Sequence, residues 1–238
     1  MVGSRKLSND EVEALLSGLD EESTEEATHQ FDPTEVREFK FGTEDLSLLG
    51  DYYALRMINE KMCRFTRSVF LPMLRIMPRI SSFPPEVKSF DEYVESCDNF
   101  VSVTNSRIEE LRGNALLVIE APFVSHLTNS YYGGSKVQSL FSQSGEFTAT
   151  EQRIIEIITE GMNASMEAAW KDMLQTKFEV QSREENIQFV SFVDGADTVI
   201  VCAFMVQMPN HDPVSFDVVY PLQTLKPISS QLRSRVQN

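Results

Sequence analysis

Two carboxylates and one amide lie on the same face of a predicted helix, where acid–base chemistry would need them. Glu156, Glu160 and Asn163 fall inside the strongest helical pattern of the 238-residue chain. Residues three or four positions apart share a helix face. A carboxylate beside an amide could orient a water molecule for attack on a phosphorylated aspartate. An ordinary solvated helix face explains the same residues, and we favour that interpretation.

Other chemical signatures are missing from the sequence. It has no glycine-rich phosphate loop, no nucleophile elbow and no histidine-containing triad. The histidines lie far apart, without the spacing of metal ligands, at His29, His126 and His211. The cysteines are unclustered and predict reduced thiols in or near the core, at Cys63, Cys97 and Cys202. We therefore expect no catalytic residue, no metal and no cofactor.

The charge of the chain restricts its partners. The net charge is −15, which argues against binding of nucleic acid or of an anionic membrane surface. The sequence has no long apolar run that would predict a membrane span, and residues 1–9 are polar, unlike a signal peptide. One basic segment could form a nucleic-acid patch, but we favour a solvated helix face for it; its residues are Arg56, Lys61, Arg64, Arg67, Arg75 and Arg79.

A short amphipathic helix is predicted near the N-terminus. Ser8 and Glu11 form a capping box, and Leu7 and Val12 have the spacing of a hydrophobic staple. The apolar face continues through Leu15 and Leu16. Residues 20–44 form an acidic linker, and residues 1–45 together carry a net charge of −9. Because a helix of about ten residues is marginal alone in water, it either docks on its own domain or, as we favour, binds a groove on a partner.

The first half of the remaining chain predicts a long helix followed by strands. The helix spans about residues 46–71, and Pro72 should kink or end it. Its apolar stripe comprises Leu55, Ile58, Met62, Phe65, Val69 and Met73. A loop at 81–85 and a short helix or turn at 90–95 follow. Strands are predicted at 100–104 and 115–120, joined by turn residues 112–114.

The second half repeats this order. A helix at 122–132, with Phe123, Leu127 and Tyr131 at helical spacing, ends at Gly133 in a left-handed conformation. A capping box of Thr148 and Glu151 begins a helix that ends at 170, with a buried stripe of Ile154, Ile155, Ile158, Met162, Met166, Ala169 and Trp170. Strands follow at 178–182, 187–192, 198–208 and 214–220, the last three as an antiparallel meander, and a closing helix spans 223–233. The order predicts an α+β domain of two similar halves, although no sequence repeat is visible.

An ordered set of motifs resembles the FliM family of flagellar motor switch proteins. The segment from Leu7 to Leu16 resembles that family's N-terminal peptide, and 58–60 with 64–65 resembles its first long helix. Residues 111–118 resemble its central strand, and 132–134 its Gly-Gly-x-Gly loop. The most specific match is Phe147-Thr148-x-Thr150-Glu151-Gln152-Arg153, with Ala169-Trp170 closing the helix.

The resemblance implies a flagellar motor switch component of the cytoplasmic C-ring, at the inner face of the inner membrane. It implies a peptide at 1–19, a linker at 20–44 and a pseudo-symmetric, CheC-like middle domain at 45–235. Neighbouring copies would form a ring. Phosphorylated CheY would bind Leu7, Ser8, Asp10, Glu11, Val12, Ala14, Leu15 and Leu16. The rotor protein FliG would bind Gly133, Gly134, Ser135 and Lys136.

Two departures from the family pattern qualify this expectation. Lys136 replaces the last glycine of the loop, and the chain stops at Asn238 just after the middle domain. The family's C-terminal domain joins FliN, so FliN binding is not carried over. The alternative function is a CheC- or FliY-type phosphatase acting on phosphorylated CheY, because Glu160 and Asn163 resemble the Glu-x-x-Asn motif of those enzymes. We favour the non-enzymatic adaptor.

Overall fold

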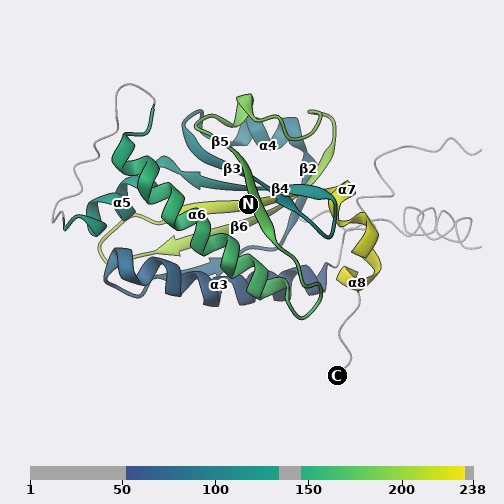
Figure 1. The fold of residues 1–238 in the computed structure, drawn as a ribbon, viewed down its shortest axis with the longest axis horizontal. Coiled ribbons are helices and arrows are strands. Elements are labelled where there is room, and N and C mark those ends of the chain that lie inside the picture. The colour runs from purple at the N-terminus through teal and green to yellow at the C-terminus, as the bar shows by residue number, and fades with distance from the viewer. Residues whose placement is uncertain (1–51, 134–145, 234–238) are drawn as a thin grey trace, which may run out of the picture. The chain divides into compact units, whose positions relative to one another are not determined.

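A computed structural model describes residues 52–133 and 146–233 of the chain. They form an antiparallel sheet flanked by helices (Figure 1). The strands are β1 (Arg79–Ser82), β2 (Glu86–Ser89), β3 (Val101–Ile108), β4 (Gly113–Glu120), β5 (Phe178–Glu184), β6 (Thr198–Gln207) and β7 (Val214–Pro221). The helices are α3 (Tyr53–Leu74), α4 (Phe90–Ser96), α5 (Ala121–Tyr131), α6 (Ala149–Trp170), η1 (Ile187–Phe189), α7 (Leu222–Leu225), η2 (Lys226–Ile228) and α8 (Ser229–Arg233).

The strand order relates the two halves by a pseudo-twofold. The order is β1-β6-β7-β4-β3-β5, with β2 also paired to β6. Each half contributes a hairpin, β3–β4 or β6–β7, and the hairpins meet where Leu117 lies opposite Val218. The strand after each long helix pairs with the hairpin of the other half, so β1 joins β6 and β5 joins β3. If β1, β6 and β7 are exchanged for β5, β3 and β4, the strand order reads the same from the opposite edge of the sheet. This symmetry confirms the expected pseudo-symmetric α+β fold.

The long helices repeat the same burial pattern. Leu55, Ile58 and Met62 of α3 are buried, and so are Ile155, Ile158 and Met162 of α6, each 100 positions later. Phe70 and Trp170 are a further buried pair at this spacing. The two helices therefore occupy equivalent places on the sheet, and two of these paired positions hold the same residue, Ile58 with Ile158 and Met62 with Met162.

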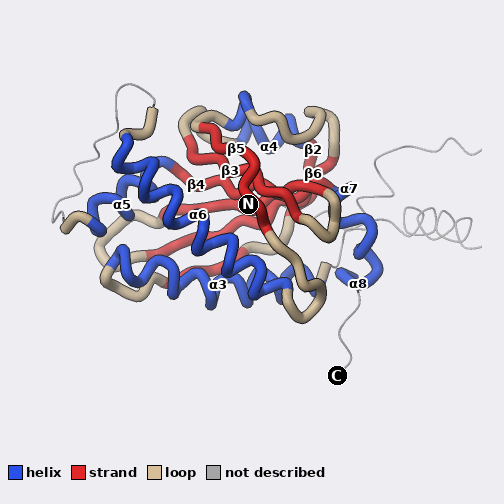
Figure 2. The backbone as a smooth tube through the Cα atoms, in the orientation of Figure 1, coloured by secondary structure: helices blue, strands red, loops and turns tan. Residues whose placement is uncertain are grey.

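The sheet is buried on both faces. Alternate residues of a strand point to opposite faces, so Leu117 and Ile119 of β4 enter the core beneath α3, α5 and α6. Leu116 and Val118 enter a second core beneath α4 and η1. Figure 2 shows the strands between these two sets of helices.

The elements predicted from local signals are confirmed. Thr148 Oγ1 accepts a 3.3 Å hydrogen bond from the Glu151 amide, and the Glu151 carboxylate accepts one of 2.9 Å from the Thr148 amide. Every residue of the predicted α6 stripe is buried. Trp170 is 1% exposed, and its indole donates a 3.3 Å hydrogen bond to the Tyr220 hydroxyl. β6 and β7 lie at the predicted places, whereas β3 continues to Ile108, beyond its predicted end at 104, and β4 begins at Gly113, inside the predicted turn.

The prediction for α3 needs correction. Pro72 does not end the helix, because it lies in the last turn and the helix continues to Leu74. Arg75 then ends it with φ 56°, its amide bonding the Leu71 carbonyl at 2.9 Å. Phe65 is 40% exposed and Val69 only partly buried, whereas Phe70 is buried in their place.

Three further predictions were wrong. Residues 187–192 form a turn rather than a strand, because Asn186 caps η1 and Val190 bonds back to Ile187; the meander therefore reduces to β6–β7. The predicted loop at 81–85 overlaps β1, and β2 begins directly after it. The closing helix is divided into α7, η2 and α8, with Pro227 in η2.

Candidate functional site

The end of α5 is the described part of the predicted glycine loop. Tyr132 and Gly133 donate backbone hydrogen bonds of 3.1 and 3.2 Å to Thr128 and Ser130. Gly133 has φ +83°, as predicted, and a Cβ built there would meet no atom of the described residues within 4 Å. The backbone conformation, rather than crowding, therefore selects glycine at this turn. Gly134, Ser135 and Lys136 lie outside the described residues.

Exposed aromatic side chains lie at this turn. Tyr132 is 62% exposed, and its ring contacts that of Tyr131 at a centroid distance of 5.1 Å. Tyr131 is also exposed, although its spacing from Phe123 and Leu127 had placed it on the apolar stripe of the helix. The turn thus presents apolar surface to solvent beside an uncrowded backbone.

The base of α5 is fixed to the rest of the domain. Phe123 and Leu127 are fully buried in the core under the sheet. Ser125 donates a 3.3 Å hydrogen bond to Glu151, the capping residue of α6. The α6 capping box therefore also anchors α5, and the Gly133 turn projects from a supported helix.

The three α6 residues considered for chemistry lie in different environments. They line one groove of about 520 Å³ together with Phe178 and Arg183 of β5. Glu160 is exposed and Glu156 pairs with Arg153 at 2.8 Å, as expected of a solvated face. Asn163 does not fit that description, because it is 6% exposed.

The amide of Asn163 connects three elements. Its Nδ2 donates to Ser106 Oγ of β3 at 3.5 Å and to the Phe178 carbonyl of β5 at 3.4 Å. These bonds join α6 to β3 and to the edge strand β5. Buried polar groups are normally paired in this way in a folded protein. The Nδ2 donor is already used by the protein, which favours a structural role, whereas Oδ1 has no hydrogen-bond partner among the described residues.

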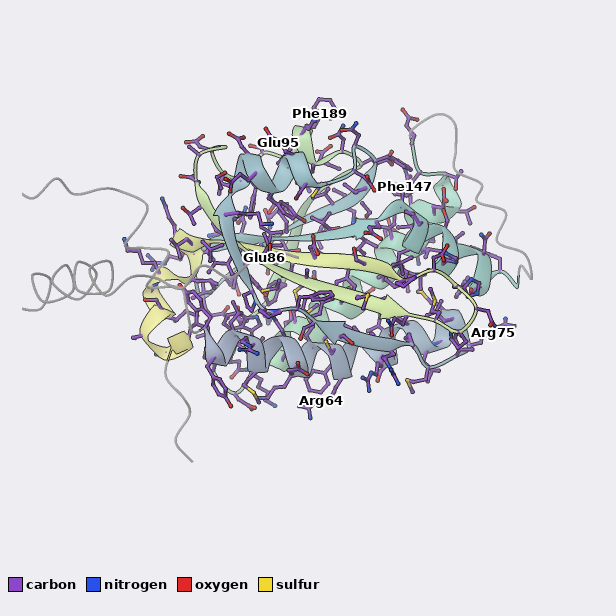
Figure 3. All side chains as sticks on the ribbon, turned by 180° about the vertical axis from the view of Figure 1, so that it is seen from behind. Arg64, Arg75, Glu86, Glu95, Phe147 and Phe189 are labelled. Atoms are coloured by element: carbon purple, nitrogen blue, oxygen red, sulfur yellow. The ribbon has the colours of Figure 1, made fainter. Side chains whose placement is uncertain are left out.

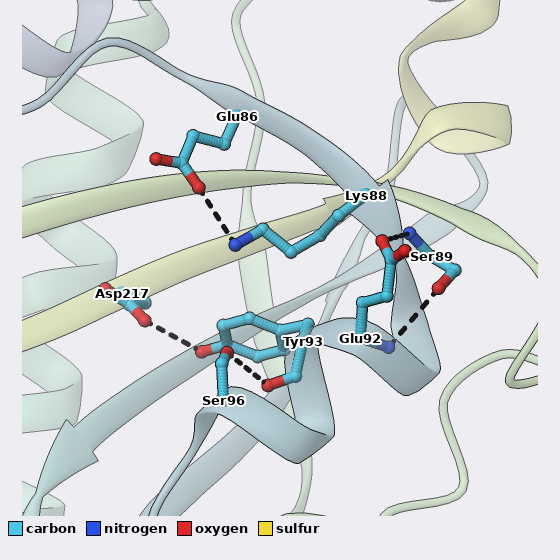
Figure 4. Close-up of polar contacts among 7 residues, drawn as sticks. All are labelled: Glu86, Lys88, Ser89, Glu92, Tyr93, Ser96 and Asp217. Atoms are coloured by element: carbon cyan, nitrogen blue, oxygen red, sulfur yellow. Dashed lines mark hydrogen bonds and ion pairs between the residues drawn. The ribbon is translucent and has the colours of Figure 1, made fainter.

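A partly buried carboxylate, Asp217, lies on the opposite face of the sheet beside Tyr93, and Figure 4 shows their contact. Tyr93 of α4 donates a 3.0 Å hydrogen bond to Asp217 of β7. Burial raises the pKa of Asp217 to about 6, while the Tyr93 hydroxyl opposes that rise and the nearby Glu120 carboxylate adds to it. Sequence reasoning missed this residue, although a charged residue within the apolar segment 214–220 was an available signal.

The cysteines behave as predicted. Cys63 and Cys202 are buried and Cys97 is partly buried, and all three are free thiols. Burial raises the pKa of Cys63 and of Cys97 to about 11 and that of Cys202 to about 12. Since the thiolate is the reactive form, these side chains pack as protonated thiols.

The histidine and arginine predictions have different outcomes. The ring centroids of His126 and His211, far apart in sequence, are 5.0 Å apart. Among residues 52–133 and 146–233, no group of three or more potential ligands could hold a metal ion. Arg56 and Arg64 of α3 are exposed, as expected of a solvated face, and Figure 3 shows Arg64 on the outer side of the helix.

The predicted CheY-binding residues, from Leu7 to Leu16, lie outside the described residues. Within the part of the chain that is described, none of the helices is long and apolar enough to cross a membrane.

Comparison with known proteins places this fold. The sequence family described as flagellar motor switch protein FliM matches residues 51–237. FliM of Pseudomonas aeruginosa is 28% identical over 98% of this chain and 71% of its own length. The FliM middle domain (51–229) of Vibrio alginolyticus is 27% identical, with a TM-score of 0.67 over 75% of this chain and 99% of that one.

A second similar structure is the FliG–FliM complex of Helicobacter pylori. Its matching chain is 18% identical, with a TM-score of 0.68 over 74% of this chain and 96% of that one. At 18% identity, this similarity is evidence for a shared fold only. The family match covers most of the chain, and the Vibrio domain shares both fold and sequence. The chain therefore belongs to the flagellar motor switch FliM family, and its described residues form the CheC-like fold of a FliM middle domain.

Proposed function

We propose that this chain, a component of the flagellar motor switch, holds the rotor protein FliG at the Gly133 end of its middle domain. The observation that carries the proposal is the turn after α5. Gly133 is in the left-handed region, has room for a Cβ among the described residues and follows two exposed tyrosines. Such a turn lets a partner backbone approach closely, and exposed aromatic rings are favourable anchors in interfaces. The likeness to a FliG-bound FliM chain supports the same assignment.

Two exposed aromatic residues allow a matched test. Tyr132 is 62% and Phe189 74% exposed, and they lie on different elements, the α5 turn and η1. Phe189 stands on the side of the sheet away from Arg64 and α3 (Figure 3). We expect Tyr132→Ala to weaken FliG binding by about tenfold or more, as truncation of an interface anchor does. Phe189→Ala should bind like the parent in the same calorimetric titration. Equal affinity of the two variants would contradict the proposed surface.

The rest of the loop gives an independent test. A side chain at Gly134 should block close approach, so Gly134→Val should weaken FliG binding. Lys136→Glu should weaken it modestly and in a salt-sensitive way if the lysine meets an acidic group on FliG. If a folded Gly134→Val variant binds FliG as the parent does, the paired glycine only ends the helix.

We further propose that residues 1–19 capture phosphorylated CheY and that residues 20–44 tether this peptide to the domain. The sequence pattern carries this proposal: a capped amphipathic helix of about ten residues needs a partner for its apolar face. Leu15→Ala together with Leu16→Ala should abolish capture, because each buried leucine contributes roughly 1.5–3 kcal/mol. The melting temperature of the domain should stay unchanged. Normal binding by the double variant would refute the assignment.

The phosphatase alternative is set aside. The family is one of structural switch proteins rather than enzymes, and the Asn163 amide is bonded to Ser106 and Phe178. A phosphate-release assay with phosphorylated CheY checks this directly, and we expect the rate with the chain present to equal the rate without it. By extension from the family, we place the chain in a ring of like copies at the cytoplasmic face of the inner membrane.

A further inference from the structure

The fold brings together two histidines from separate elements. His126 lies in the middle of α5, and His211 lies in the turn between β6 and β7. Their rings are in edge contact, with centroids 5.0 Å apart and an interplanar angle of 73°. Among the described residues, neither imidazole has a hydrogen-bond partner. His126 is half-buried and His211 exposed, so the pair is open to solvent on one side.

The backbone on both sides of the pair is held in place. Asn210 adopts φ 60°, and the His211 amide bonds the Met208 carbonyl at 3.4 Å. Met208 is itself buried in the core beneath α5. His126 is carried by a helix whose neighbours Phe123 and Leu127 are fully buried. Independent, supported elements therefore hold the two backbone positions that carry the rings, as a site built on rigid elements requires.

We propose that His126 and His211 form a two-histidine site for a divalent transition-metal ion of the zinc or nickel class. Two imidazoles bound to one tetrahedral ion at about 2.0–2.1 Å have ring centroids roughly 5 Å apart, close to the separation seen here. The ion needs the rings to rotate so that each aims one nitrogen at it, while the backbone stays in place. Solvent completes the coordination.

The charges around the pair favour a bound cation. Metal ions bind neutral imidazole. Burial of His126 lowers its pKa, and the facing His211 lowers it further, whereas Asp212 opposes both effects. His126 is thus largely neutral near pH 7, and no proton has to be displaced from it. The carboxylate of Asp212 and the overall charge of −15 add attraction for a cation.

Occupancy of this site would tie α5 to the β6–β7 turn. The ion would cross-link two elements that chain connectivity separates, and any ligand that binds only the folded state raises its stability. The site differs from the proposed FliG contact at the end of α5 and does not depend on it.

The experiment uses the full chain without a histidine tag, treated with chelator and titrated with Ni²⁺ or Zn²⁺ near pH 7.5. We expect the calorimetric titration to show one binding event. The melting temperature should rise when the metal is in molar excess over the protein. His126→Gln and His211→Gln should each weaken binding by more than about tenfold, since even supporting residues of metal sites carry effects of about 10–100-fold. His211 is exposed, so its variant should fold as the parent does.

The chain supplies a matched control in its third histidine. His29→Gln should bind Ni²⁺ like the parent. Mg²⁺ prefers carboxylates, so it should give no comparable rise in melting temperature. This control distinguishes binding at the histidine pair from binding at the acidic segments. The proposal is overturned if the parent shows no rise with either ion, or if both glutamine variants retain parental binding.

Discussion

Replacing Asp217 with asparagine should stabilise the protein at neutral and alkaline pH. The pKa of this carboxyl is raised by burial from its ordinary value of 3.8 to about 6, so the folded state holds its proton to higher pH than the unfolded state does. The contribution of Asp217 to the unfolding free energy is therefore complete below pH about 3.8, and it is lost as the pH rises through about 6. One pKa unit corresponds to about 1.36 kcal/mol, so the total change is roughly 3 kcal/mol. An asparagine cannot ionise, yet its carbonyl oxygen can still accept the Tyr93 hydrogen bond (Figure 4).

The assay is urea unfolding of the parent and the Asp217→Asn variant across pH about 4 to 8. Subtracting the unfolding free energy of the parent from that of the variant removes the pH-dependent contributions of the other titrating groups, which both chains share. It should move in favour of the variant by roughly 3 kcal/mol as the pH rises. A difference that stays flat over this range would refute the reasoning, because it would mean that burial does not raise the pKa of Asp217.

Two further variants sharpen the test. Tyr93→Phe removes the hydroxyl that lowers the pKa of Asp217, so the pH dependence should shift to higher pH. Asp172 is a surface carboxyl whose pKa is lowered by Lys61, so Asp172→Asn should not reproduce the alkaline stabilisation. The direction of the pKa shift therefore distinguishes the partly buried carboxyl of Asp217 from the exposed, paired carboxyl of Asp172.

Three predictions concern the packing of the helices. Trp170→Ala should lower the unfolding free energy by about 3–5 kcal/mol, and native fluorescence of this lone tryptophan should be blue-shifted; a red-shifted native spectrum would contradict its burial. Gly133→Ala should cost about 1 kcal/mol in urea unfolding through its φ of +83°, and an unchanged midpoint would argue against that conformation. Gly161→Ala places a Cβ 2.6 Å from Val69 Cγ1, so overpacking of about 1–3 kcal/mol should outweigh the helix-propensity gain. A second change, Val69→Ala, should recover part of that loss, and additive effects of the two changes would exclude the contact.

Sequence alone determined the elements whose signals are local. The Thr148–Glu151 capping box, the α6 stripe and the stop at Gly133 each involve residues within a few positions of one another, and all are present in the structure. The ordered motifs also predicted the family and its two-halved fold. Short-range hydrogen bonds and helical periodicity do not depend on the rest of the chain, so they can be read before the fold is known.

Only the tertiary structure decided which short apolar segments pair and which do not. The four-residue strands β1 and β2 exist because both pair with β6. Residues 187–192 have a strand-like composition but form a turn, because Asn186 caps it locally and the second core buries Ile187 and Val190. Strand formation depends on a distant partner and on burial, so short segments carry too little information to predict it.

The same limit applies to single polar residues. Asn163 is structural because Ser106 and Phe178 reach it, and His126 gains its counterpart from a turn 85 positions further along the chain, at His211. Asp217 acquires its raised pKa only when folding removes it from solvent and brings Glu120 near it. In each case the side chain's chemistry is set by groups that are distant in sequence, because burial and electrostatic neighbours arise when the sheet and helices assemble.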